Sequence, residues 1–521
     1  MNYAVNAQEM KQYDNNTIEY YGIPSTVLME RAALAVFYEI TGRFYPDCGK
    51  ILVLCGAGNN GGDGFALARL LYLKGYQTQI FFAMDEGSMT PETKAQCLSA
   101  QKYNVPQTKE LLEYPYTVIV DALFGIGLAR PIEGRLASLI NKINHINAYK
   151  IALDISSGIS ADTGSVLGTA FCADLTVTFA FAKIGHLLYP GAEYTGELII
   201  KDIGIDKHSF LGKAPQARYL TTQNAKQMLP IRSPYSNKGT FGKALVIAGS
   251  PEMAGAAYFA AKAAYYSGCG LVRILTPNEN RDILLTKLPE AVLSVYDAKA
   301  DDLGSLMDLL EVCMDWADAV LIGPGLGQSP ASQMLVTKAL QYTDKKIVFD
   351  ADALNILSKN MVLLKESKAQ RIVTPHLGEM GRMAGKSIKE IQAGLLKIAQ
   401  DFAKEYQAVC ILKDARTVIG LPEGEYYINT TGNCGMATGG SGDVLAGIVT
   451  GFLAQGLELG NAAAAAVCLH GEAGDKAAEK RGSYGMVASD LLEEIPGVVR
   501  RVSQLANING TTSTTTKRRK K

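Results

Sequence analysis

The sequence predicts an α/β protein with two domains, each built on a doubly wound and mostly parallel sheet. At 521 residues the chain is too long for a single hydrophobic core. Short apolar runs alternate with helical stretches in both halves, which is typical of βαβ units. Two glycine-rich loops, CGAGNNGGDG at residues 55–64 and NCGMATGGSGD at residues 433–443, each follow a strand-like region and open a helix of small residues. Two anion-binding loops of different chemistry indicate two active sites and a pair of coupled reactions.

The composition excludes several classes of protein. Lys plus Arg and Asp plus Glu number 51 each, so no global field attracts nucleic acid. The first residues carry no apolar signal core, and no apolar run approaches the ~20 residues of a membrane span. The nine cysteines are scattered and form no CxxC pair, which favours reduced thiols in the cytosol. We therefore expect a cytoplasmic homo-oligomer with small-molecule substrates and without nucleic-acid or membrane partners.

The first half holds the strands of the first predicted sheet. A buried strand is expected at residues 51–55, and the first glycine-rich loop leads from it into a helix at residues 65–74. Further strands are expected at residues 79–83, 117–121, 150–155, 175–179 and 198–202. Because helical stretches separate these runs, the pattern predicts a parallel doubly wound sheet in a domain spanning residues 1–215.

The second half restarts the same pattern after a weak stretch at residues 207–238, which should contain the domain boundary. Strands are expected at residues 243–248, 271–275, 319–322, 346–349, 371–374 and 408–412. Helices are expected at residues 254–266, 388–404, 444–455 and 461–480. The second domain should span residues 225–507, and the polar and then basic tail at residues 508–521 is predicted to be disordered.

The second glycine-rich loop has the chemistry of a phosphoryl-transfer site. Gly439, Gly440 and Gly442 allow backbone N–H groups to turn inward, and the following helix adds the positive end of its dipole. Asp443 would repel a phosphate, so it is better suited to activate a hydroxyl group beside one. The alternative is that Asp443 only caps the helix.

Other polar motifs follow the strands of the second half. They are GPGLG at residues 323–327, FDADALN at 349–355, TPHLGEM at 374–380 and KDART at 413–417. The carboxyl ends of parallel strands meet at one edge of a sheet, where α/β proteins bind ligands. KDART offers cations and a hydroxyl to a polyphosphate, whereas the carboxylates of FDADALN serve either as caps or as support for Mg²⁺. No Walker-type GxxxxGK[ST] motif is present.

Across residues 240–490 the chain resembles the carbohydrate-kinase-like dehydratases of NAD(P)H-hydrate repair, a branch of the ribokinase superfamily. GSPEMAGAA, GPGLG, DADALN, TPHLGEM, KDART and NTTGNCGMATGGSGDVLAG occur in the family's order. The chain departs from the family with GSGD for GTGD, KDART for KGART, and Pro251-Glu252 where an arginine commonly stands. The resemblance implies a ribokinase-like α/β/α sandwich.

The resemblance also implies a reaction and its residues. ADP with Mg²⁺ phosphorylates the hydroxyl of a hydrated nicotinamide ring, and loss of phosphate then restores the dihydropyridine and leaves AMP. Asp443 is the expected catalytic residue. The hydrated dinucleotide is expected to contact Ala254, Gly325, His376 and Asp443. The nucleotide is expected to contact Lys413, Asp414, Ala415, Arg416, Thr417 and Gly442.

The first glycine-rich loop combines anion binding with oxygen ligands. Asn60, Asp121 and Ser157 follow successive strands, and their oxygen atoms could surround a monovalent cation. Asp154, at the end of the next strand, would remain free for proton transfer. The alternative is that both aspartates cap turns or helices.

Residues 1–215 resemble the NAD(P)H-hydrate epimerase family, known as the YjeF N-terminal domain, through GNNGGDG, VDALFGIG, LDISSG, FAKIGH and DIGI. The resemblance implies a Rossmann-like sheet, K⁺ bound by Asn60, Asp121 and Ser157, and Asp154 as the acid/base. The hydrated cofactor is expected to contact Asn59, Asn60, Gly61, Gly62, Asp63, Gly125, Ile126, Gly127, Leu128, Ala129, Arg130, Pro131 and Asp154. Ser156 replaces the usual proline, which removes one rigid φ. Lys183 in FAKIG could assist this chemistry, but a solvated lysine is expected.

The main hypothesis is a bifunctional repair enzyme whose first domain epimerises R- and S-NAD(P)HX and whose second domain dehydrates the S form with ADP. The first alternative is a ribokinase-like kinase for a vitamin or sugar alcohol with an N-terminal regulatory nucleotide-binding module. The second alternative makes the first half an interaction scaffold with a degenerate site.

Overall fold

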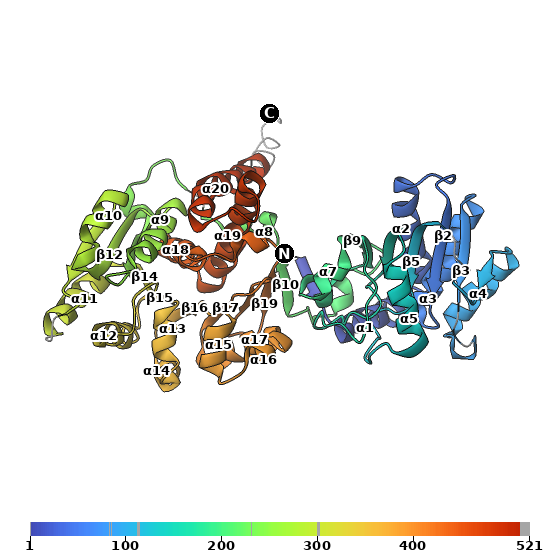
Figure 1. The fold of residues 1–521 in the computed structure, drawn as a ribbon, viewed down its shortest axis with the longest axis horizontal. Helices are drawn as coiled ribbons and strands as arrows, with labels where there is room; N and C mark the ends of the chain where they lie inside the picture. The colour runs from blue at the N-terminus through green and yellow to red at the C-terminus, as the bar shows by residue number, and fades with distance from the viewer. Residues whose placement is uncertain are drawn as a thin grey trace, which may run out of the picture. The chain divides into compact units, whose positions relative to one another are not determined.

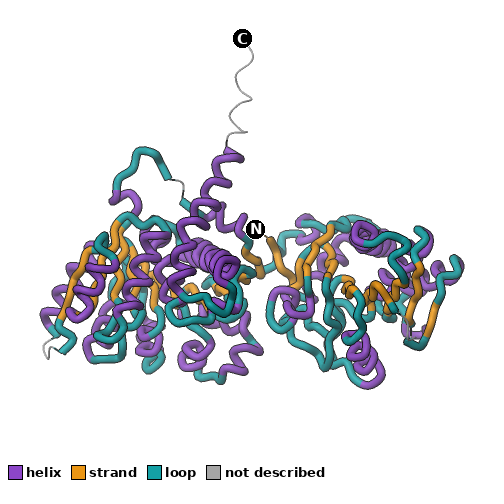
Figure 2. Tube along the Cα trace, turned by 45° about the horizontal axis from the view of Figure 1, so that its top comes forward, coloured by secondary structure: helices purple, strands orange, loops and turns teal. Residues whose placement is uncertain are grey.

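The computed structural model describes residues 2–82, 84, 86–111, 115–230, 232–299 and 303–510. The chain divides into two compact units, an N-terminal unit at Tyr3–Ala217 and a C-terminal unit that begins at Arg218 (Figure 1). Both units are mixtures of helices and strands (Figure 2), so the α/β class expected from the sequence is confirmed.

The N-terminal unit contains a parallel sheet with strand order β4-β3-β2-β5-β6-β7-β9. The strands are β2 (Lys50–Cys55), β3 (Gln77–Phe81), β4 (Gln107–Thr108), β5 (Tyr116–Ala122), β6 (Tyr149–Leu153), β7 (Leu175–Phe179) and β9 (Glu197–Lys201). A separate parallel pair joins β1 (Asn2–Val5) to β8 (Ala182–Lys183). All strands expected in this half are present, with ends shifted by one or two residues.

Helices cover both faces of this sheet because alternate strand residues are apolar on both faces. Ile51, Val53 and Val120 pack with α2 (Ser25–Arg43) and α3 (Asn59–Leu73), whereas Leu52 and Leu54 pack with α5 (Gly134–Asn144). The remaining helices are α1 (Ala7–Asn15), α4 (Pro91–Lys102), α6 (Ile184–Leu187) and α7 (Gly191–Thr195). The strand order reverses at β2, since β3 lies on one side of it and β5 on the other, and ligands bind at such switch points in open α/β sheets.

The helix after the first glycine-rich loop begins at Asn59, so the expected start at residue 65 was wrong. Glycines disfavour helices, but close packing requires them here. A Cβ on Gly61 would lie 1.8 Å from the carbonyl oxygen of Gly56, and one on Gly64 would lie 2.7 Å from the Cβ of Ala122. The NNGGDG motif therefore forms the first turn of a helix pressed against β2 and β5.

The sheet of the C-terminal unit has the strand order β13-β12-β11-β14-β15-β16-β17-β18-β19-β10. It is parallel from β13 to β17 and continues as an antiparallel hairpin through β18 and β19. The strands are β10 (Ala217–Leu220), β11 (Lys243–Ile247), β12 (Leu271–Pro277), β13 (Val292–Tyr296), β14 (Ala319–Ile322), β15 (Lys346–Phe349), β16 (Gln370–Val373), β17 (Val409–Leu412), β18 (Val418–Gly420) and β19 (Tyr426–Asn429).

Helices form a layer on each face of this sheet. In Figure 1, α9 (Ala254–Tyr266), α18 (Ser441–Ala454), α19 (Leu459–Arg481) and α20 (Ala488–Gly510) lie above the strands. Below them lie α11 (Gly304–Trp316), α12 (Pro330–Ala339), α13 (Asp352–Leu357), α14 (Met361–Glu366), α15 (Leu377–Ala384), α16 (Ile388–Ala393) and α17 (Leu395–Tyr406). The remaining helices are α8 (Thr222–Met228) and α10 (Arg281–Lys287).

Helices α9 and α18 run parallel in close contact along a glycine seam. A Cβ on Gly447 would lie 2.2 Å from the carbonyl oxygen of Ala260, and one on Gly451 would lie 2.1 Å from Oγ of Ser267. Only glycine allows the backbones to approach this closely. The seam places the first turns of both helices at the carboxyl ends of the strands, where the motifs of this half converge.

Several expectations about elements need correction. The helix expected at residues 388–404 is two helices, α16 and α17, separated at Gly394. The stretch at residues 207–238, read as weak, contains β10 and α8. The tail expected from residue 508 overlaps the end of α20 at Gly510, and residues 511–521 lie outside the described residues. Across the described ranges, no helix has the length and apolar character needed to span a bilayer.

Candidate active sites

The N-terminal unit brings Asn60, Asp121 and Ser157 together at the carboxyl ends of β2, β5 and β6. Ser157 Oγ donates to Asp121 Oδ1 at 2.7 Å, and the backbone N–H of Ser157 donates to Asp121 Oδ2 at 2.8 Å. Asn60 Nδ2 donates to the carbonyl oxygen of Phe124 at 3.0 Å. Asn60 Oδ1 is buried without a hydrogen-bond partner in the described part of the chain. An unsatisfied buried amide oxygen is available as a ligand to a cation.

Asp121 also stabilises a turn, since its Oδ1 accepts a 3.1 Å hydrogen bond from the backbone N–H of Leu123. The capping alternative and the ligand interpretation are therefore compatible for this residue. Asp121 is fully buried, and burial raises its pKa to about 6 against the opposing hydrogen bonds from Ser157 and Leu123. A nearby cation would offset this cost of ionisation.

Asp154 lies beyond β6 in the left-handed region, with φ of 61°. Its Oδ1 accepts hydrogen bonds from Lys183 Nζ at 2.5 Å, from Thr178 Oγ1 at 3.0 Å and from the backbone N–H of Phe179 at 3.4 Å. Burial alone would raise the pKa of Asp154, but the Lys183 ammonium and these hydrogen bonds together lower it below its usual value. Asp154 is thus an ionised carboxylate, and the expectation that Lys183 is solvated was wrong, because its side chain is only 1% exposed.

Two further carboxyl groups interact with Asp154. Burial, and then repulsion by Asp154, raise the pKa of Asp63 on α3 well above its usual value. The same two causes raise the pKa of Asp14 on α1, against the attraction of Lys183. The site therefore combines one ionised carboxylate with two that favour the neutral form. The sequence analysis did not include Asp14, because no motif surrounds it.

The rest of the first site is more exposed. A Cβ on Gly125 would lie 3.3 Å from the Cβ of Asn60, so this glycine lies directly against the amide, and Asn59 Oδ1 accepts a 2.8 Å hydrogen bond from Thr90. Gly127, Ala129, Arg130 and Pro131 are exposed beyond Gly125. Ser156, in place of the usual proline, is buried and donates a 2.8 Å hydrogen bond to the carbonyl oxygen of Tyr194, which anchors the loop by another means.

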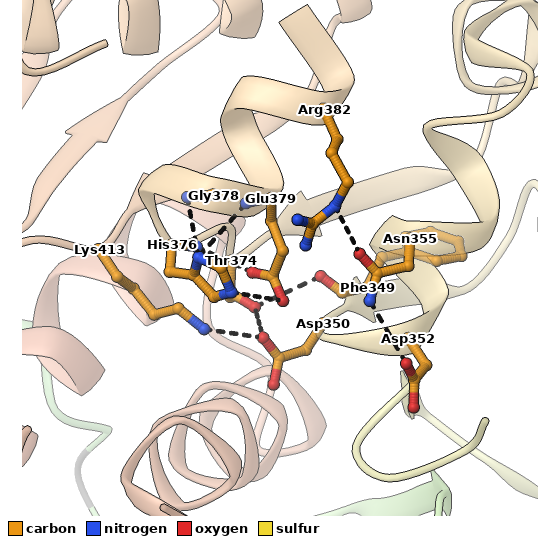
Figure 3. A network of polar contacts seen from close by, with 10 residues as sticks. All are labelled: Phe349, Asp350, Asp352, Asn355, Thr374, His376, Gly378, Glu379, Arg382 and Lys413. Carbon is orange, nitrogen blue, oxygen red and sulfur yellow. Dashed lines mark hydrogen bonds and ion pairs between the residues drawn. The ribbon is translucent and has the colours of Figure 1, made fainter. Parts of the chain in front are cut away.

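The C-terminal unit places Lys413 and Asp350 in a buried ion pair (Figure 3). Lys413 Nζ lies 3.0 Å from Asp350 Oδ1, and the same oxygen accepts a 2.5 Å hydrogen bond from Thr374 Oγ1. Burial would lower the pKa of Lys413, but Asp350, Glu379 and Asp443 together raise it above its usual value. A Cβ on Gly442 would lie 3.3 Å from Lys413 Nζ. The ammonium therefore lies beside the second glycine-rich loop, where an anion would bind.

Asp443 lies in the first turn of α18 rather than at its N-cap, which is Gly440 with φ of 91°. The capping alternative for Asp443 was therefore wrong. Burial and then repulsion by Asp350 raise the pKa of Asp443 to about 7, against the attraction of Lys413. A carboxyl group with a pKa near neutrality can both accept and return a proton.

His376 is the N-cap of α15, as Figure 3 shows. Its Nδ1 accepts from the backbone N–H groups of Gly378 at 2.9 Å and Glu379 at 3.3 Å. Burial lowers the pKa of His376 against the attraction of Glu379. The imidazole is thus neutral with its proton on Nε2, which lies 3.4 Å from Glu379 Oε1, and the side chain is half exposed.

Gly325 lies against the first turn of α9, which begins at Ala254, at the strand-order reversal between β11 and β14. Gly325 has φ of 57°, and a Cβ there would lie 2.8 Å from the Cβ of Ala256 in the first turn of α9. Asp352 Oδ2 accepts a 2.8 Å hydrogen bond from the N–H of Gly327. In the KDART loop, Asp414 and Ala415 are exposed, and the guanidinium of Arg416 donates to the carbonyl oxygen of Thr430.

Family models match both halves of the chain. One described as NAD(P)H-hydrate dehydratase matches residues 244–497, and one described as YjeF-related protein N-terminus matches residues 25–185. A protein of Moorella thermoacetica named bifunctional NAD(P)H-hydrate repair enzyme Nnr is 40% identical, over 96% of this chain and 97% of the relative. The chain belongs to this family.

A second full-length relative agrees with this assignment. The Escherichia coli repair enzyme of the same name is 35% identical over 95% of this chain and 93% of its own length. A crystal structure of an ADP/ATP-dependent NAD(P)H-hydrate dehydratase from Bacillus subtilis is 32% identical with a TM-score of 0.47, and it covers 55% of this chain and 98% of that one. Like other NAD(P)H-hydrate repair enzymes, the protein combines an epimerase half and a dehydratase half, so it is an isomerase and a lyase.

One residue of the dehydratase half escaped the sequence analysis. His470 on α19 is buried, and its Nε2 donates to the carbonyl oxygen of Ser441 at 2.9 Å. Burial lowers its pKa to about 4, so the imidazole stays neutral. It anchors the first residue of α18 two positions before Asp443. A single histidine in an alanine-rich helix gave no signal of this contact.

Proposed function

We propose that the chain repairs hydrated NADH and NADPH in two steps with the roles expected from the sequence. The N-terminal site interconverts R- and S-NAD(P)HX, and the C-terminal site dehydrates the S epimer with ADP, releasing AMP and phosphate. The observation that carries the proposal is Asp443, a carboxyl group with a pKa of about 7 next to the Lys413 ammonium at the start of α18.

At the C-terminal site, Asp443 accepts the proton of the ring hydroxyl as its oxygen attacks the terminal phosphorus of ADP. Lys413, the N–H groups around Gly442 and the N-terminus of α18 stabilise the transferring phosphoryl group. The ring nitrogen then expels phosphate, a better leaving group than hydroxide. The C–O bond breaks, loss of the neighbouring ring proton restores the double bond, and the dihydropyridine is regenerated.

Mg²⁺ would enter this site with the nucleotide. The carboxylates of Asp350 and Asp352 are already hydrogen bonded, to Lys413 and Thr374 and to Gly327 respectively. The described residues include no group of three or more His, Cys, Asp or Glu side chains able to hold a metal. Mg²⁺ commonly binds through substrate phosphates and water with few protein ligands, which fits this arrangement.

At the N-terminal site, K⁺ fits Asn60, Asp121 and Ser157, because Asn60 Oδ1 is a buried oxygen without a partner. A cation held there would supply positive charge to oxygens of the bound dinucleotide. Asp154 exchanges a proton with the hydrated ring, either by reversible ring opening or by reversible loss of water at the hydrated carbon. In the first route the ring closes again on the opposite face, and in the second route water returns to the opposite face.

The cytoplasmic location and the homo-oligomeric state are part of the same proposal. The nine cysteines are all free thiols, which suits a reducing compartment. Gel filtration with light scattering would measure the oligomeric state directly.

One assay tests the two reactions. Mixed R- and S-hydrated NADH is incubated with ADP, Mg²⁺ and K⁺ while the near-UV absorbance of the dihydropyridine is followed. We expect full recovery for the wild type and none for Asp443→Asn, whereas Asp154→Asn should recover the S half at the normal rate and the rest slowly. Turnover with ATP alone would contradict the choice of ADP, a stable phosphorylated product would favour the kinase alternative, and unchanged epimerisation without K⁺ would contradict the cation.

A further inference from the structure

The FAKIGH motif at residues 181–186 converges on Asp154, and this inference rests on the proposed epimerisation. Lys183 lies at the end of β8 and directly precedes the short helix α6. Its side chain is 1% exposed, and its Nζ donates to Asp154 Oδ1 at 2.5 Å, to Thr178 Oγ1 at 2.8 Å and to the carbonyl oxygen of Phe179 at 3.1 Å. An ammonium group has three N–H donors, so all three are engaged.

The hydrogen bonds to Asp154 are unevenly distributed between its oxygens. Oδ1 accepts from Lys183, Thr178 and Phe179, whereas Oδ2 accepts none from the described residues. Oδ1 is held by three donors, which is the number that strongly favours an ionised carboxylate. Oδ2 is therefore the oxygen available to exchange a proton, and the carboxylate is held in one orientation.

The neighbours of Lys183 hold it in this position. The backbone N–H of Lys183 donates to His186 Nδ1 at 3.1 Å, which fixes the remaining imidazole proton on Nε2. Burial and then repulsion by Lys183 lower the pKa of His186 to about 3, so the ring is neutral despite the attraction of Asp154. A Cβ on Gly185 would lie 2.1 Å from the carbonyl oxygen of Ser160, so the motif packs closely onto the loop after β6.

We propose that Lys183 is the positioning residue of the epimerase site: it holds Oδ1 of Asp154 so that the carboxylate remains ionised and presents Oδ2 to the substrate. Lys183 does not donate a proton itself, since each of its N–H groups is engaged. Without it, Asp154 would lie near Asp63 on α3 and Asp14 on α1, with only the neutral His186 and Thr178 beside it, and the burial that Lys183 now offsets would favour protonation.

The test is the pH dependence of epimerisation, measured from the pure R epimer without nucleotide so that the C-terminal site is silent. Lys183→Met should lower kcat by about 100-fold, the effect of losing a general base, with KM changed by less than about threefold. The acidic limb of its pH profile should move up by about one pH unit or more. Lys183→Arg keeps the charge but not the geometry, so it should keep the wild-type limb with intermediate kcat.

Two controls separate positioning from folding. Lys74→Met removes an exposed lysine at the end of α3 and should leave epimerisation unchanged. The circular dichroism spectrum and unfolding temperature of Lys183→Met report on the fold of the N-terminal unit, and dehydration of the pure S epimer with ADP reports on the C-terminal unit. Two observations together would overturn the proposal. The acidic limb of the pH profile would be unchanged in Lys183→Met, and its loss of rate would be explained by a lower unfolding temperature.

A second measurement tests the effect of Lys183 on the ionisation of Asp154 without relying on the epimerase reaction. Difference infrared spectra, taken between each protein and its Asp154→Asn variant, report the ionisation of this one carboxyl group. We expect it to be ionised at pH 5 in the wild type and protonated in Lys183→Met. If these ionisation states are found but the wild type does not epimerise, the role of Lys183 is supported and the epimerase reaction is rejected. If Asp154 is ionised in Lys183→Met at pH 5, the role of Lys183 is rejected.

Discussion

Two carboxyl groups in this chain have pKa values that are shifted in opposite directions. Asp154 and Asp443 both lie at the edges of sheets where burial disfavours charge. Asp154 has a lysine and two further donors on one oxygen, and its pKa is lowered. Asp443 has Asp350 near it as well as Lys413, which Asp350 already engages, and its pKa is raised to about 7. Burial raises the pKa of both groups, so the difference between the two pKa values comes from their charged and hydrogen-bonding partners.

The raised pKa of Asp443 predicts that Asp443→Asn loses activity and gains stability. A carboxyl group with a folded pKa above its unfolded value destabilises the native state increasingly as pH rises from about 4 to about 7. Asparagine does not ionise, so the variant should unfold at a higher temperature than the wild type at pH 8, with the difference vanishing near pH 4. Thermal unfolding at the two pH values tests this, and an equal shift at both would contradict the assigned ionisation.

The rate of dehydration by the wild type should depend on the same pKa. Because the carboxylate form of Asp443 accepts the proton, kcat/KM for dehydration of the S epimer should fall as pH drops through about 7. A profile that stays flat down to pH 5 would show that Asp443 is not the base.

Ser156 predicts a local loss of stability when its hydroxyl is removed. Ser156→Ala removes one of two hydrogen bonds to the carbonyl oxygen of Tyr194, which keeps the backbone N–H of Ala173 at 3.1 Å, so the variant should lose about 0.5–1.5 kcal/mol of stability. Denaturant unfolding should show this loss, while Ser138→Ala, at an exposed position on α5, should change stability by less than about 0.5 kcal/mol. Equal effects of the two variants would mean that the loop is not anchored through Ser156.

At the scale of elements, the contact between α9 and α18 determines the geometry of the dehydratase site. Ala254 lies at the start of α9 and Asp443 in the first turn of α18, and the seam of Gly447 and Gly451 holds the two helices together. In the proposed reaction, the spacing between the dinucleotide and the phosphoryl group would therefore depend on Gly447 and Gly451, which are not among the proposed ligand contacts.

The space around two helical glycines predicts opposite effects of Gly→Ala substitutions on stability. Gly447→Ala places a methyl group 2.2 Å from the carbonyl oxygen of Ala260, and overpacking of this kind costs about 1–3 kcal/mol. Gly497→Ala on α20 has no neighbour within 4 Å and should stabilise that helix by up to about 1 kcal/mol. Unfolding curves of both variants test this, and Gly447→Ala should also slow dehydration without changing epimerisation.

Motifs and periodicity predicted most strands. They also predicted that the polar motifs of each unit lie together, because the carboxyl ends of parallel strands meet at one edge of a sheet. They failed where tertiary contacts overrode local preference. The start of α3 at Asn59 was unpredictable from helix propensity, since three glycines fill that turn for packing reasons. Lys183 was misread as solvated because its partners, Asp154 and Thr178, lie on other elements, and Asp14 carries no motif at all.

At the scale of the whole molecule, the two chemistries occupy separate units with separate cores. Each site is assembled from residues of its own unit, so a point change in one should leave the other intact. A mixture of Asp154→Asn and Asp443→Asn proteins should therefore repair racemic hydrated NADH completely, since free diffusion of the epimers joins the two activities. Recovery that stops at half in the mixture, while each single activity is normal, would indicate that the intermediate does not leave the chain.

The contrasting carboxyl groups also affect the fate of damaged cofactor in acid. Near pH 6 most Asp443 is protonated, whereas Asp154 is still ionised by Lys183. The epimers would then continue to interconvert while dehydration to the reduced cofactor slows. In an acidified cell, a mixture of both epimers of the hydrated dinucleotide would therefore accumulate. When neutrality returns, the S epimer would be dehydrated at once, and the R epimer would follow through epimerisation.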